Sequence, residues 1–214
     1  MDELKIDAPK LPRELSELLL PHGMLYDEDV FREGVIKDCV IEQQNADRVT
    51  FDKVVLRNAA FAETALSRME MIDVILDRCD LSNIDFSGAI IHRAEFRHCK
   101  LIGIDLMEAT LRNVRFTGCN ASYANFRFAN MKQVQFQECL LVHADLYSST
   151  VLQTQFENCD LDQAQLSGTK LAGIDLSECT FTALGAGLDD LQGCIISPEQ
   201  AAVFAAQFGL KIKE

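Results

Sequence analysis

The sequence predicts an all-β solenoid with four-sided coils, and two periodicities carry this prediction. Every fifth residue from Phe31 to Phe181 is apolar, without a break. Cysteine recurs every twenty residues, at Cys79, Cys99, Cys119, Cys139, Cys159 and Cys179. Neither a helical period of 3.6 nor a simple alternation produces a strict period of five. A parallel solenoid does repeat at a fixed interval, because each coil stacks on the one before it.

The unit of five residues corresponds to one side of a coil. A second small or medium-sized residue precedes many of the central apolar residues by two positions, as Ala94 precedes Phe96. Residues two apart on an extended strand point the same way, so a turn must follow to restore the phase. Four units of five make one coil of twenty. The predicted β-helix covers residues 31–196. With coils about 4.8 Å apart, its unbroken repeat over residues 31–181 predicts a rod roughly 35–40 Å long.

The N-terminal leader, residues 1–30, contains leucines at helical spacing in "LPRELSELLLPHG". Pro12 near the start, and Pro21 and Gly23 at the end, frame a short predicted helix. We expect this helix to cover the open end of the first coils, because a solenoid needs terminal caps. The alternative is a helix that binds a partner.

The C-terminal segment, residues 197–214, follows a weakening of the repeat at "ALGAGLDD". Ser197 is a predicted N-cap, Pro198 occupies the first helical position, and Gln200 completes a capping box. Gly209 is expected to end the helix, and "LKIKE" to form a terminal strand or an extended tail.

The predicted C-terminal helix and tail carry an apolar face that is too large to be left in water. This face either covers its own last coil or docks on a second copy of the chain, and a continuous apolar patch favours the second copy. The predicted dimer interface consists of Ala201, Phe204, Ala205, Phe208, Leu210 and Ile212.

Composition and charge exclude several classes of function. The net charge of −13 argues against direct nucleic-acid binding and favours cationic surfaces on other proteins. No uninterrupted apolar run is long enough to span a membrane, and the acidic N-terminus does not resemble a signal peptide, so a cytoplasmic protein is expected. No CxxC pair, phosphate loop or spacing of histidine with a nucleophile indicates a metal, a cofactor or catalysis.

Outward positions must therefore carry the function, and two groups of them are candidates. Residues 131–190 have a net charge of −7, and their carboxylates form a predicted partner-binding surface: Glu138, Asp145, Glu157, Asp160, Asp162, Asp175, Glu178, Asp189 and Asp190. An aromatic pair flanks an arginine in the predicted contact patch Tyr123, Arg127 and Phe128. Carboxylates stacked one coil apart, such as Asp85 and Asp105, are expected to bond to backbone N–H groups of the turns.

Units such as "CDLSN", "ANFRF", "ADLYS" and "CDLDQ" resemble the A(D/N)LxX motif of the pentapeptide-repeat family. The resemblance implies a right-handed quadrilateral β-helix over residues 31–181. Three further stretches, "LPRELSELL", "ASYANFRFAN" and "ISPEQAAVFAAQFGL", resemble the Qnr and MfpA quinolone-resistance proteins, particularly the chromosomal Qnr-like proteins of Gram-positive bacteria.

This second resemblance implies a non-catalytic homodimer, joined head to head through the C-terminal helix. It also implies imitation of DNA, binding to DNA gyrase or topoisomerase IV, and protection of that enzyme from fluoroquinolones. The repeat of this chain is not interrupted by the loops on which strong protection depends in proteobacterial Qnr proteins, so the departure implies weaker protection. The alternative function is a general protein-interaction scaffold unrelated to DNA topology.

Overall fold

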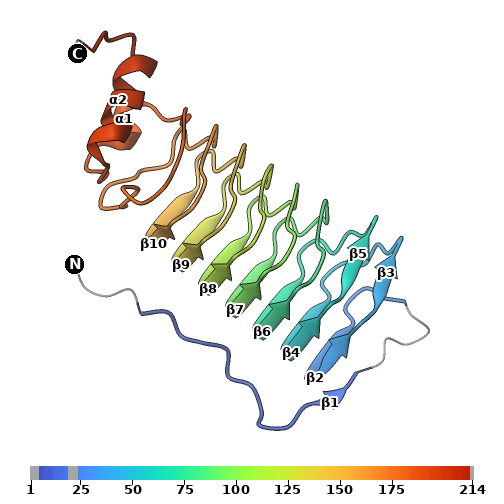
Figure 1. Cartoon of the computed structure of the whole chain (residues 1–214). Coiled ribbons are helices and arrows are strands. Elements are labelled where there is room, and N and C mark those ends of the chain that lie inside the picture. Colours follow the sequence, from blue (N-terminus) through green and yellow to red (C-terminus); the bar gives the residue numbers. More distant parts are fainter. Residues whose placement is uncertain (1–4, 19–23, 213–214) are drawn as a thin grey trace.

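The computed structural model describes residues 5–18 and 24–212 and shows a parallel β-solenoid (Figure 1). Seven strands of the described chain, each of eight residues, stack along one side of the rod. An eighth short strand, β1 (Ser16–Glu17), pairs with the first of them, so the sheet order is β1-β2-β4-β6-β7-β8-β9-β10. The long strands are β2 (Val30–Lys37), β4 (Thr50–Arg57), β6 (Glu70–Asp77), β7 (Ile90–Arg97), β8 (Thr110–Thr117), β9 (Asn130–Gln137) and β10 (Thr150–Glu157).

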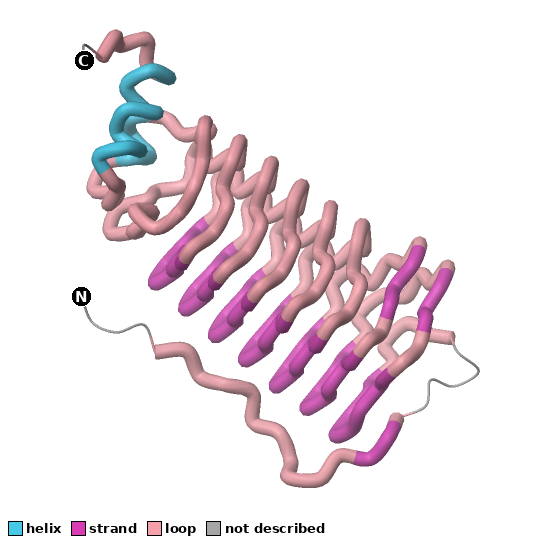
Figure 2. Tube along the Cα trace, viewed as in Figure 1, coloured by secondary structure: helices cyan, strands magenta, loops and turns pink. Residues whose placement is uncertain are grey.

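The register between neighbouring coils is twenty residues, as the sequence predicts. Phe96 pairs with Phe116 and Phe116 with Phe136, always in parallel. On another side of the rod, β3 (Val40–Glu42) and β5 (Ala60–Ala62) form a two-stranded sheet. Isolated bridges such as Asp105–Asn125 continue the same register along the remaining coils. The rungs are visible as a regular stack in Figure 2.

The corners of the coil explain why the period is five. Every fifth residue from Glu28 to Gly173 has a positive φ, and most of these residues are not glycine. Single residues in the left-handed region turn the chain sharply between two extended segments. Four such corners in each twenty residues give the coil four sides. Polar side chains such as Asn58 and Asn83, which tolerate this conformation, occupy several corners.

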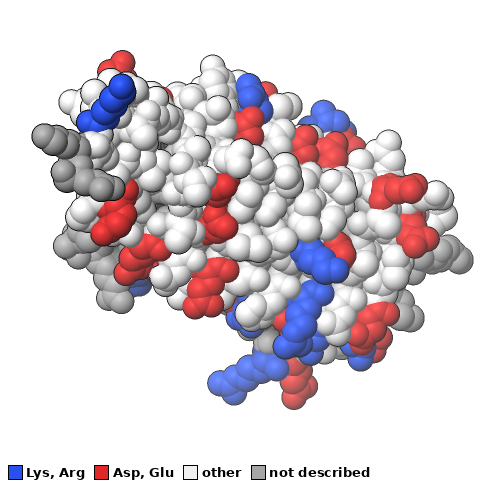
Figure 3. All heavy atoms as spheres, turned by 45° about the horizontal axis from the view of Figure 1, so that its top comes forward, with Lys and Arg blue, Asp and Glu red and all other residues white. Residues whose placement is uncertain are grey.

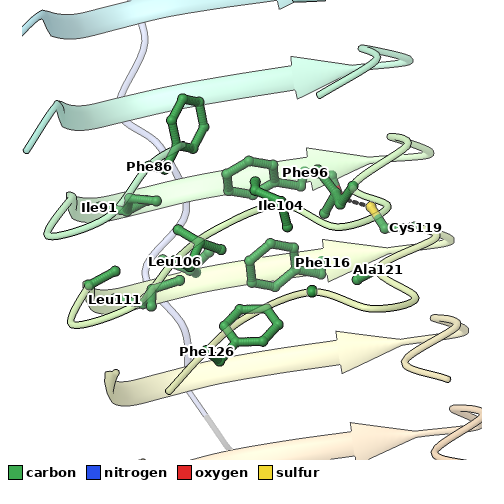
Figure 4. Close-up of a cluster of buried hydrophobic side chains, with 14 of the residues drawn as sticks. Phe86, Ile91, Phe96, Ile104, Leu106, Leu111, Phe116, Cys119, Ala121 and Phe126 are labelled. Carbon is green, nitrogen blue, oxygen red and sulfur yellow. Dashed lines mark hydrogen bonds between the residues drawn. The ribbon is translucent and has the colours of Figure 1, made fainter. Parts of the chain in front are cut away.

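The core is a set of side-chain columns that run along the rod axis. The apolar residues at every fifth position from Phe31 to Phe181 are all buried, and so are the residues two positions earlier from Ala89 to Ala144. Figure 4 shows aromatic and aliphatic side chains of successive coils pointing into this interior. Phe96, Phe116 and Phe136 stack with ring centroids 4.7 Å apart. In these columns, each side chain packs mainly on the equivalent side chains of the coils before and after it.

The cysteines at intervals of twenty are buried structural residues. The six thiols from Cys79 to Cys179 form one such column, with exposed fractions of at most 5%. Each thiol contacts backbone carbonyls; for example, Sγ of Cys119 donates to the oxygen of Phe96 at 3.3 Å. Burial raises the pKa of the Cys179 thiol to about 12. These cysteines therefore behave as small apolar side chains.

The prediction of an N-terminal helix is wrong over residues 11–18, and the rest of the predicted helix reaches residues outside the described part. Residues 5–18 instead run in an extended conformation along the rod (Figure 1). Ser16 and Glu17 pair with Gly34 and Val35 at the free edge of β2, which offers unpaired backbone groups. Backbone pairing and packing on this edge outweigh the helical spacing of the leucines.

Gly34 makes this arrangement sterically feasible. A Cβ atom on Gly34 would lie 2.4 Å from Cγ of Leu18 and 2.7 Å from the backbone oxygen of Ser16. Leu18 packs against the hydrophobic core at the beginning of the rod. The N-terminal segment therefore covers the edge of the first coil, as a cap is expected to do, but as a strand.

The C-terminal end of the rod is covered by α1 (Leu188–Leu191) and α2 (Pro198–Gln207). The predicted capping box at Ser197 and Gln200 is confirmed. Gly209, with φ of 78°, follows the helix, and Gly209 and Leu210 donate their N–H groups to Ala206 and Ala205. This pair of hydrogen bonds is a Schellman motif. Residues 210–212 do not form a strand.

No helix within residues 5–18 and 24–212 combines the length and the apolar character that a membrane-spanning segment requires.

Candidate partner-binding surface

Six of the predicted carboxylates gather around one corner of the last coils. Glu138 and Glu178 occupy this corner two coils apart, and Glu157 lies directly before it. Asp160 and Asp175 lie on the two sides that meet at this corner. Asp162 lies at the far end of the side that carries Asp160, directly before the next corner at Gln163. Glu138 and Glu178 are exposed, while the others are partly exposed. We call this set the acidic corner: Glu138, Glu157, Asp160, Asp162, Asp175 and Glu178. In Figure 3, red surfaces lie over both halves of the molecule, whereas most blue surfaces lie from the middle toward the end away from the C-terminal helices.

Hydrogen bonds to turn groups hold several of these carboxylates in place. Oδ1 of Asp160 accepts from the backbone N–H of Asp162 at 3.0 Å, and Oδ1 of Asp175 accepts from the backbone N–H of Ser177 at 2.9 Å. Asp162 accepts from the hydroxyl and the N–H of Thr182, which lowers the pKa of Asp162 to about 2. The Asp162 carboxylate is therefore ionised and fixed in orientation at neutral pH.

The remaining three predicted carboxylates lie elsewhere. Asp145 forms an ion pair with Arg127 at 2.8 Å on a different side of the coil. Asp189 is exposed on α1. Asp190 is only 8% exposed, and it accepts hydrogen bonds from the N–H of Gly168 and from Nζ of Lys170. Those bonds lower the pKa of Asp190. Asp190 thus fastens α1 to the coil beneath it and does not contribute to an exposed acidic surface.

The stacked carboxylates of the side that carries Asp145 make the predicted turn contacts. Asp85 accepts from the N–H of Ser87 at 2.8 Å and Asp105 from that of Met107 at 2.9 Å. Asn125 interrupts the column of charges and donates to Oδ1 of Asp105 at 3.0 Å. These residues stabilise the turns, so they are structural.

The predicted aromatic patch is divided between two corners. Tyr123 is 61% exposed and stacks on His143 of the next coil, with ring centroids 4.9 Å apart. At the neighbouring corner, the guanidinium of Arg127 lies 4.5 Å from the centre of the Tyr147 ring, and Phe128 meets the same ring edge to face. Arg127 also contacts Asp145, so its charge is already compensated within the chain.

Comparison with known proteins identifies the repeat. Residues 69–146 and 89–166 match the family described as "Pentapeptide repeat region", and residues 159–183 match the family described as "Pentapeptide repeats (8 copies)". The chain belongs to the pentapeptide-repeat family. This pentapeptide-repeat protein is also 38% identical over 103 residues to the uncharacterized protein YisX of Bacillus subtilis, a match that spans 48% of each chain. The match thus extends over about half the length of that curated relative.

Two solved structures match this pentapeptide-repeat protein over most of its length. A trypsin-treated form of QnrB1, a plasmid-mediated fluoroquinolone resistance protein, is 21% identical with a TM-score of 0.58, over 88% of this chain and 99% of that one. HetL, a pentapeptide repeat protein involved in heterocyst differentiation regulation in Nostoc, is 18% identical with a TM-score of 0.33, over 79% of this chain and 90% of that one. The first likeness supports the β-solenoid architecture.

The predicted dimer face of this pentapeptide-repeat protein is divided between its own cap and an exposed groove. Phe204 is 6% exposed and packs on Phe181, with ring centroids 5.6 Å apart, so it belongs to the cap. Gln200 fastens the helix below by donating to the backbone oxygens of Leu176 and Cys179. The exposed part of the face includes Ala201, Phe208, Leu210 and Ile212, and Ala205 is half-buried.

An apolar groove of about 280 Å³ extends this exposed face across the cap. Phe208 is 39% exposed and Leu210 is 65% exposed, and α1 adds the 67% exposed Leu188 to the same groove. Leu188 could not be assigned to this surface from the sequence, because it lies on a short helix where the five-residue period is breaking down.

The described residues of this pentapeptide-repeat protein contain no cluster of three or more His, Cys, Asp or Glu side chains arranged to hold a metal ion. Three surfaces remain as candidates for binding a partner. The acidic corner and the divided aromatic patch lie on the coils, and the apolar groove lies on the cap.

Proposed function

We propose that this protein is a non-catalytic DNA mimic that binds a type II topoisomerase, DNA gyrase or topoisomerase IV, through its acidic corner. The observation that carries the proposal is the gathering of six carboxylates around one edge of a straight rod, with none of the cationic side chains of the last three coils paired to them. Elongated DNA-binding grooves are cationic, so an acidic rod is electrostatically complementary to them.

The charge density of the acidic corner supports this proposal. Its six carboxylates extend from Glu138 to Glu178, which is two coil steps, or about 10 Å along the rod. That amounts to roughly one negative charge per 1.6 Å, while double-stranded DNA carries one per about 1.7 Å of its axis. The hydrogen bonds to Asp160, Asp162 and Asp175 keep part of this array rigid. A rigid array loses little entropy on binding.

A homodimer joined through the C-terminal groove extends the array. The groove is apolar, and the acidic corner lies on the coils next to it. Two copies that bury Phe208 and Leu210 against each other bring their acidic corners toward one central stretch. The dimer thus doubles the length of the charged surface and buries apolar groups that a single copy exposes.

The likeness in fold to QnrB1, which is named as a fluoroquinolone resistance protein, supports a protective role for this chain. From Glu28 to Gly173 the corners repeat without an inserted loop. We propose that protection from fluoroquinolones is accordingly weak and depends on occupancy of the DNA-binding groove.

A supercoiling assay tests the proposal. Purified protein is titrated into DNA gyrase and topoisomerase IV reactions, with and without ciprofloxacin. We expect the protein at micromolar concentration to reduce the strand passage of each enzyme, which is supercoiling for gyrase and decatenation for topoisomerase IV, and to reduce drug-induced DNA cleavage. The variant with Glu138→Lys and Glu178→Lys should lose both effects. If wild-type protein changes neither reaction, the proposed function is wrong.

The matched control carries the same change of charge at other corners of the coil. Glu63 and Glu108 are exposed and have a positive φ, as Glu138 does. The variant with Glu63→Lys and Glu108→Lys should keep the activity of the wild type. Equal loss in both variants would show that net charge, rather than the acidic corner, determines binding.

The exposed aromatic stack favours a second candidate function, a general protein-interaction scaffold. Tyr123 and His143 present a flat aromatic surface on the outside of the rod, and Phe128 is 48% exposed. Exposed aromatic side chains are typical of protein interfaces. A scaffold of this kind should lose its partners on Tyr123→Ala and Phe128→Ala, and keep them when the acidic corner is altered.

A further inference from the structure

The strand β10 is the last strand of the long sheet, and one of its edges is open. Along the rod, the residue at the corner after each strand donates its N–H to the next coil, as Gly118 donates to Gln137 and Glu138 to Glu157. Within the described residues this series ends at Glu138. Residues 170–177, which would form the next strand, are not a strand. The edge of β10 therefore offers unpaired backbone groups.

The loss of backbone hydrogen bonds between β10 and the next coil is confined to this side of the rod. Just before it, the N–H of Gln165 still donates to Ala144 at 2.9 Å, and just after it, the N–H of Thr180 donates to Cys159 at 2.9 Å. Between these two contacts lies a hollow of about 210 Å³. It is lined by Thr154, Gln155, Phe156, Glu157, Gly173, Asp175 and Glu178.

The hollow contains a buried polar group without a partner. Thr154 is 4% exposed, and its hydroxyl is the only buried side-chain N or O atom of the described chain that has no hydrogen bond. Its register partner one coil earlier is Val134, and other coils also have valine at this inward position, such as Val114. A buried hydroxyl without a partner lowers the stability of the fold. Threonine at this position is therefore less favourable than valine unless a ligand forms a hydrogen bond with the hydroxyl.

The charged groups of the hollow are all carboxylates, which accept hydrogen bonds, and Gln155 adds a side-chain amide that can both donate and accept. Glu157, Asp175 and Glu178 contribute carboxylates, and none of the lining residues is Lys or Arg. Gln135 donates to Oε1 of Glu157, and Ser177 donates to Oδ1 of Asp175. The second oxygen of each carboxylate has no hydrogen bond within the described chain. A ligand for this hollow must therefore bring positive charge and several N–H donors.

We propose that the hollow between β10 and residues 173–178 binds the guanidinium group of an arginine side chain of a partner protein. Guanidinium has five N–H donors in a planar fork, which can bond two carboxylates and a hydroxyl at the same time. A lysine ammonium has three donors at a single point and cannot reach acceptors on both sides of the hollow. Phe156 also lines the hollow, and an aromatic side chain is a favourable neighbour for a planar cation.

This inference rests on the proposed function only for the identity of the partner. If the proposed function holds, the partner is a topoisomerase that inserts an arginine next to the acidic corner. Recognition of guanidinium by the isolated protein does not depend on any topoisomerase. The two proposals can therefore fail separately.

Binding of N-acetyl-arginine methylamide to the full-length ¹⁵N-labelled protein, followed by NMR, tests the inference. We expect saturable shifts of the backbone amide signals of Thr154–Glu157 and Gly173–Glu178. N-acetyl-lysine methylamide should produce much weaker shifts. Thr154→Val should lower the affinity for the arginine compound about fivefold, the effect of one hydrogen bond. Glu178→Gln should also weaken binding, and Glu138→Gln, at the same corner but outside the hollow, should not.

Any one of three results would overturn the inference. The absence of saturable shifts would show that the hollow holds only water, and equal binding of the lysine compound would show that it does not select guanidinium. An unchanged affinity for the arginine compound in Thr154→Val would show that the Thr154 hydroxyl does not bind the ligand. Inhibition of supercoiling without binding of the arginine compound would support the proposed function and reject this inference. Binding of the arginine compound without inhibition of supercoiling would support this inference and reject the proposed function.

Discussion

Phe116 and Phe136 stack face to face across one coil step, with ring centroids 4.7 Å apart and ring planes 4° apart. Both rings are fully buried. Because each ring also contacts a further phenylalanine on its other side, at Phe96 and Phe156, the four rings form a continuous column. A vacancy in such a column removes two aromatic contacts at once.

Phe116→Ala is therefore expected to lower the free energy of unfolding by about 3–5 kcal/mol. Urea unfolding followed by circular dichroism measures the change. Phe116→Leu, which fills more of the space, should have a smaller effect. If the urea midpoint of Phe116→Ala is close to that of the wild type, the phenylalanine column does not contribute substantially to stability.

Thr154→Val is expected to stabilise the protein by about 1 kcal/mol, because it removes an unsatisfied hydroxyl and keeps the shape of the side chain. The reciprocal change at the equivalent position one coil earlier, Val134→Thr, should destabilise it. Both changes are measured by urea unfolding in the absence of any ligand. Stabilisation by the Val134→Thr variant would show that the interior satisfies hydroxyl groups more easily than the structure indicates.

Asp162 makes stability depend on pH in the acidic range. Its pKa falls from 3.8 to about 2 on folding, mainly because the Thr182 hydroxyl donates to the carboxylate. A group with a depressed folded-state pKa stabilises the fold above its unfolded pKa, and this contribution disappears as the pH falls through the folded value. The wild type should therefore be more stable than Asp162→Asn at pH 6.

The difference between the wild type and Asp162→Asn should narrow as the pH decreases from about 4 to about 2, which urea midpoints across this range would show. Asp189→Asn, on an exposed residue of α1, serves as the control and should leave the midpoint nearly unchanged. A difference that stays constant down to pH 2 would contradict the assignment to the Asp162 carboxylate.

Phe208→Asp combined with Leu210→Asp should convert a dimer into a monomer, because both side chains are exposed on the apolar groove of the cap and charges would be buried in the interface. Light scattering coupled to size exclusion measures the mass. Val40→Asp with Leu152→Asp changes two other exposed apolar residues, which lie outside the cap, and should leave the mass unaltered. Phe204 is unsuitable for this test, because its removal would damage the cap itself.

The thiols should react in two classes. Cys39 and Cys194 are half-buried, and burial raises the pKa of Cys39 and brings that of Cys194 to about 11. An aromatic disulfide reagent should therefore modify these two slowly in the native protein. The six thiols of the buried column should react only after unfolding in denaturant. Rapid reaction of more than two thiols in the folded protein would show that the coils open easily.

The repeat could be recognised from the sequence because the same requirement recurs at every corner and every inward position. One irregular residue matters little in such a pattern, so Gln44 and Gly34 did not obscure it. The C-terminal helix was predictable for a local reason: Ser197, Pro198 and Gln200 satisfy the first turn without help from distant residues.

The features that the sequence did not reveal depend on contacts between distant parts of the chain. The leucines of residues 11–18 have helical spacing, but the free edge of β2 determines their conformation. Asp190 looks like an exposed turn residue until Lys170 and Gly168 are placed beside it. Thr154 was visible as a polar residue at an inward position, yet the opening beside it depends on how residues 170–177 leave the sheet.

The N-terminal segment also affects the order of events during synthesis. The N–H of Asp7 donates to Asn113 and the backbone oxygen of Lys5 accepts from Gln133, residues that leave the ribosome more than a hundred positions later. The coils can form one after another as they emerge. Residues 5–7 can therefore complete these contacts only after the coils that contain Asn113 and Gln133 have been made.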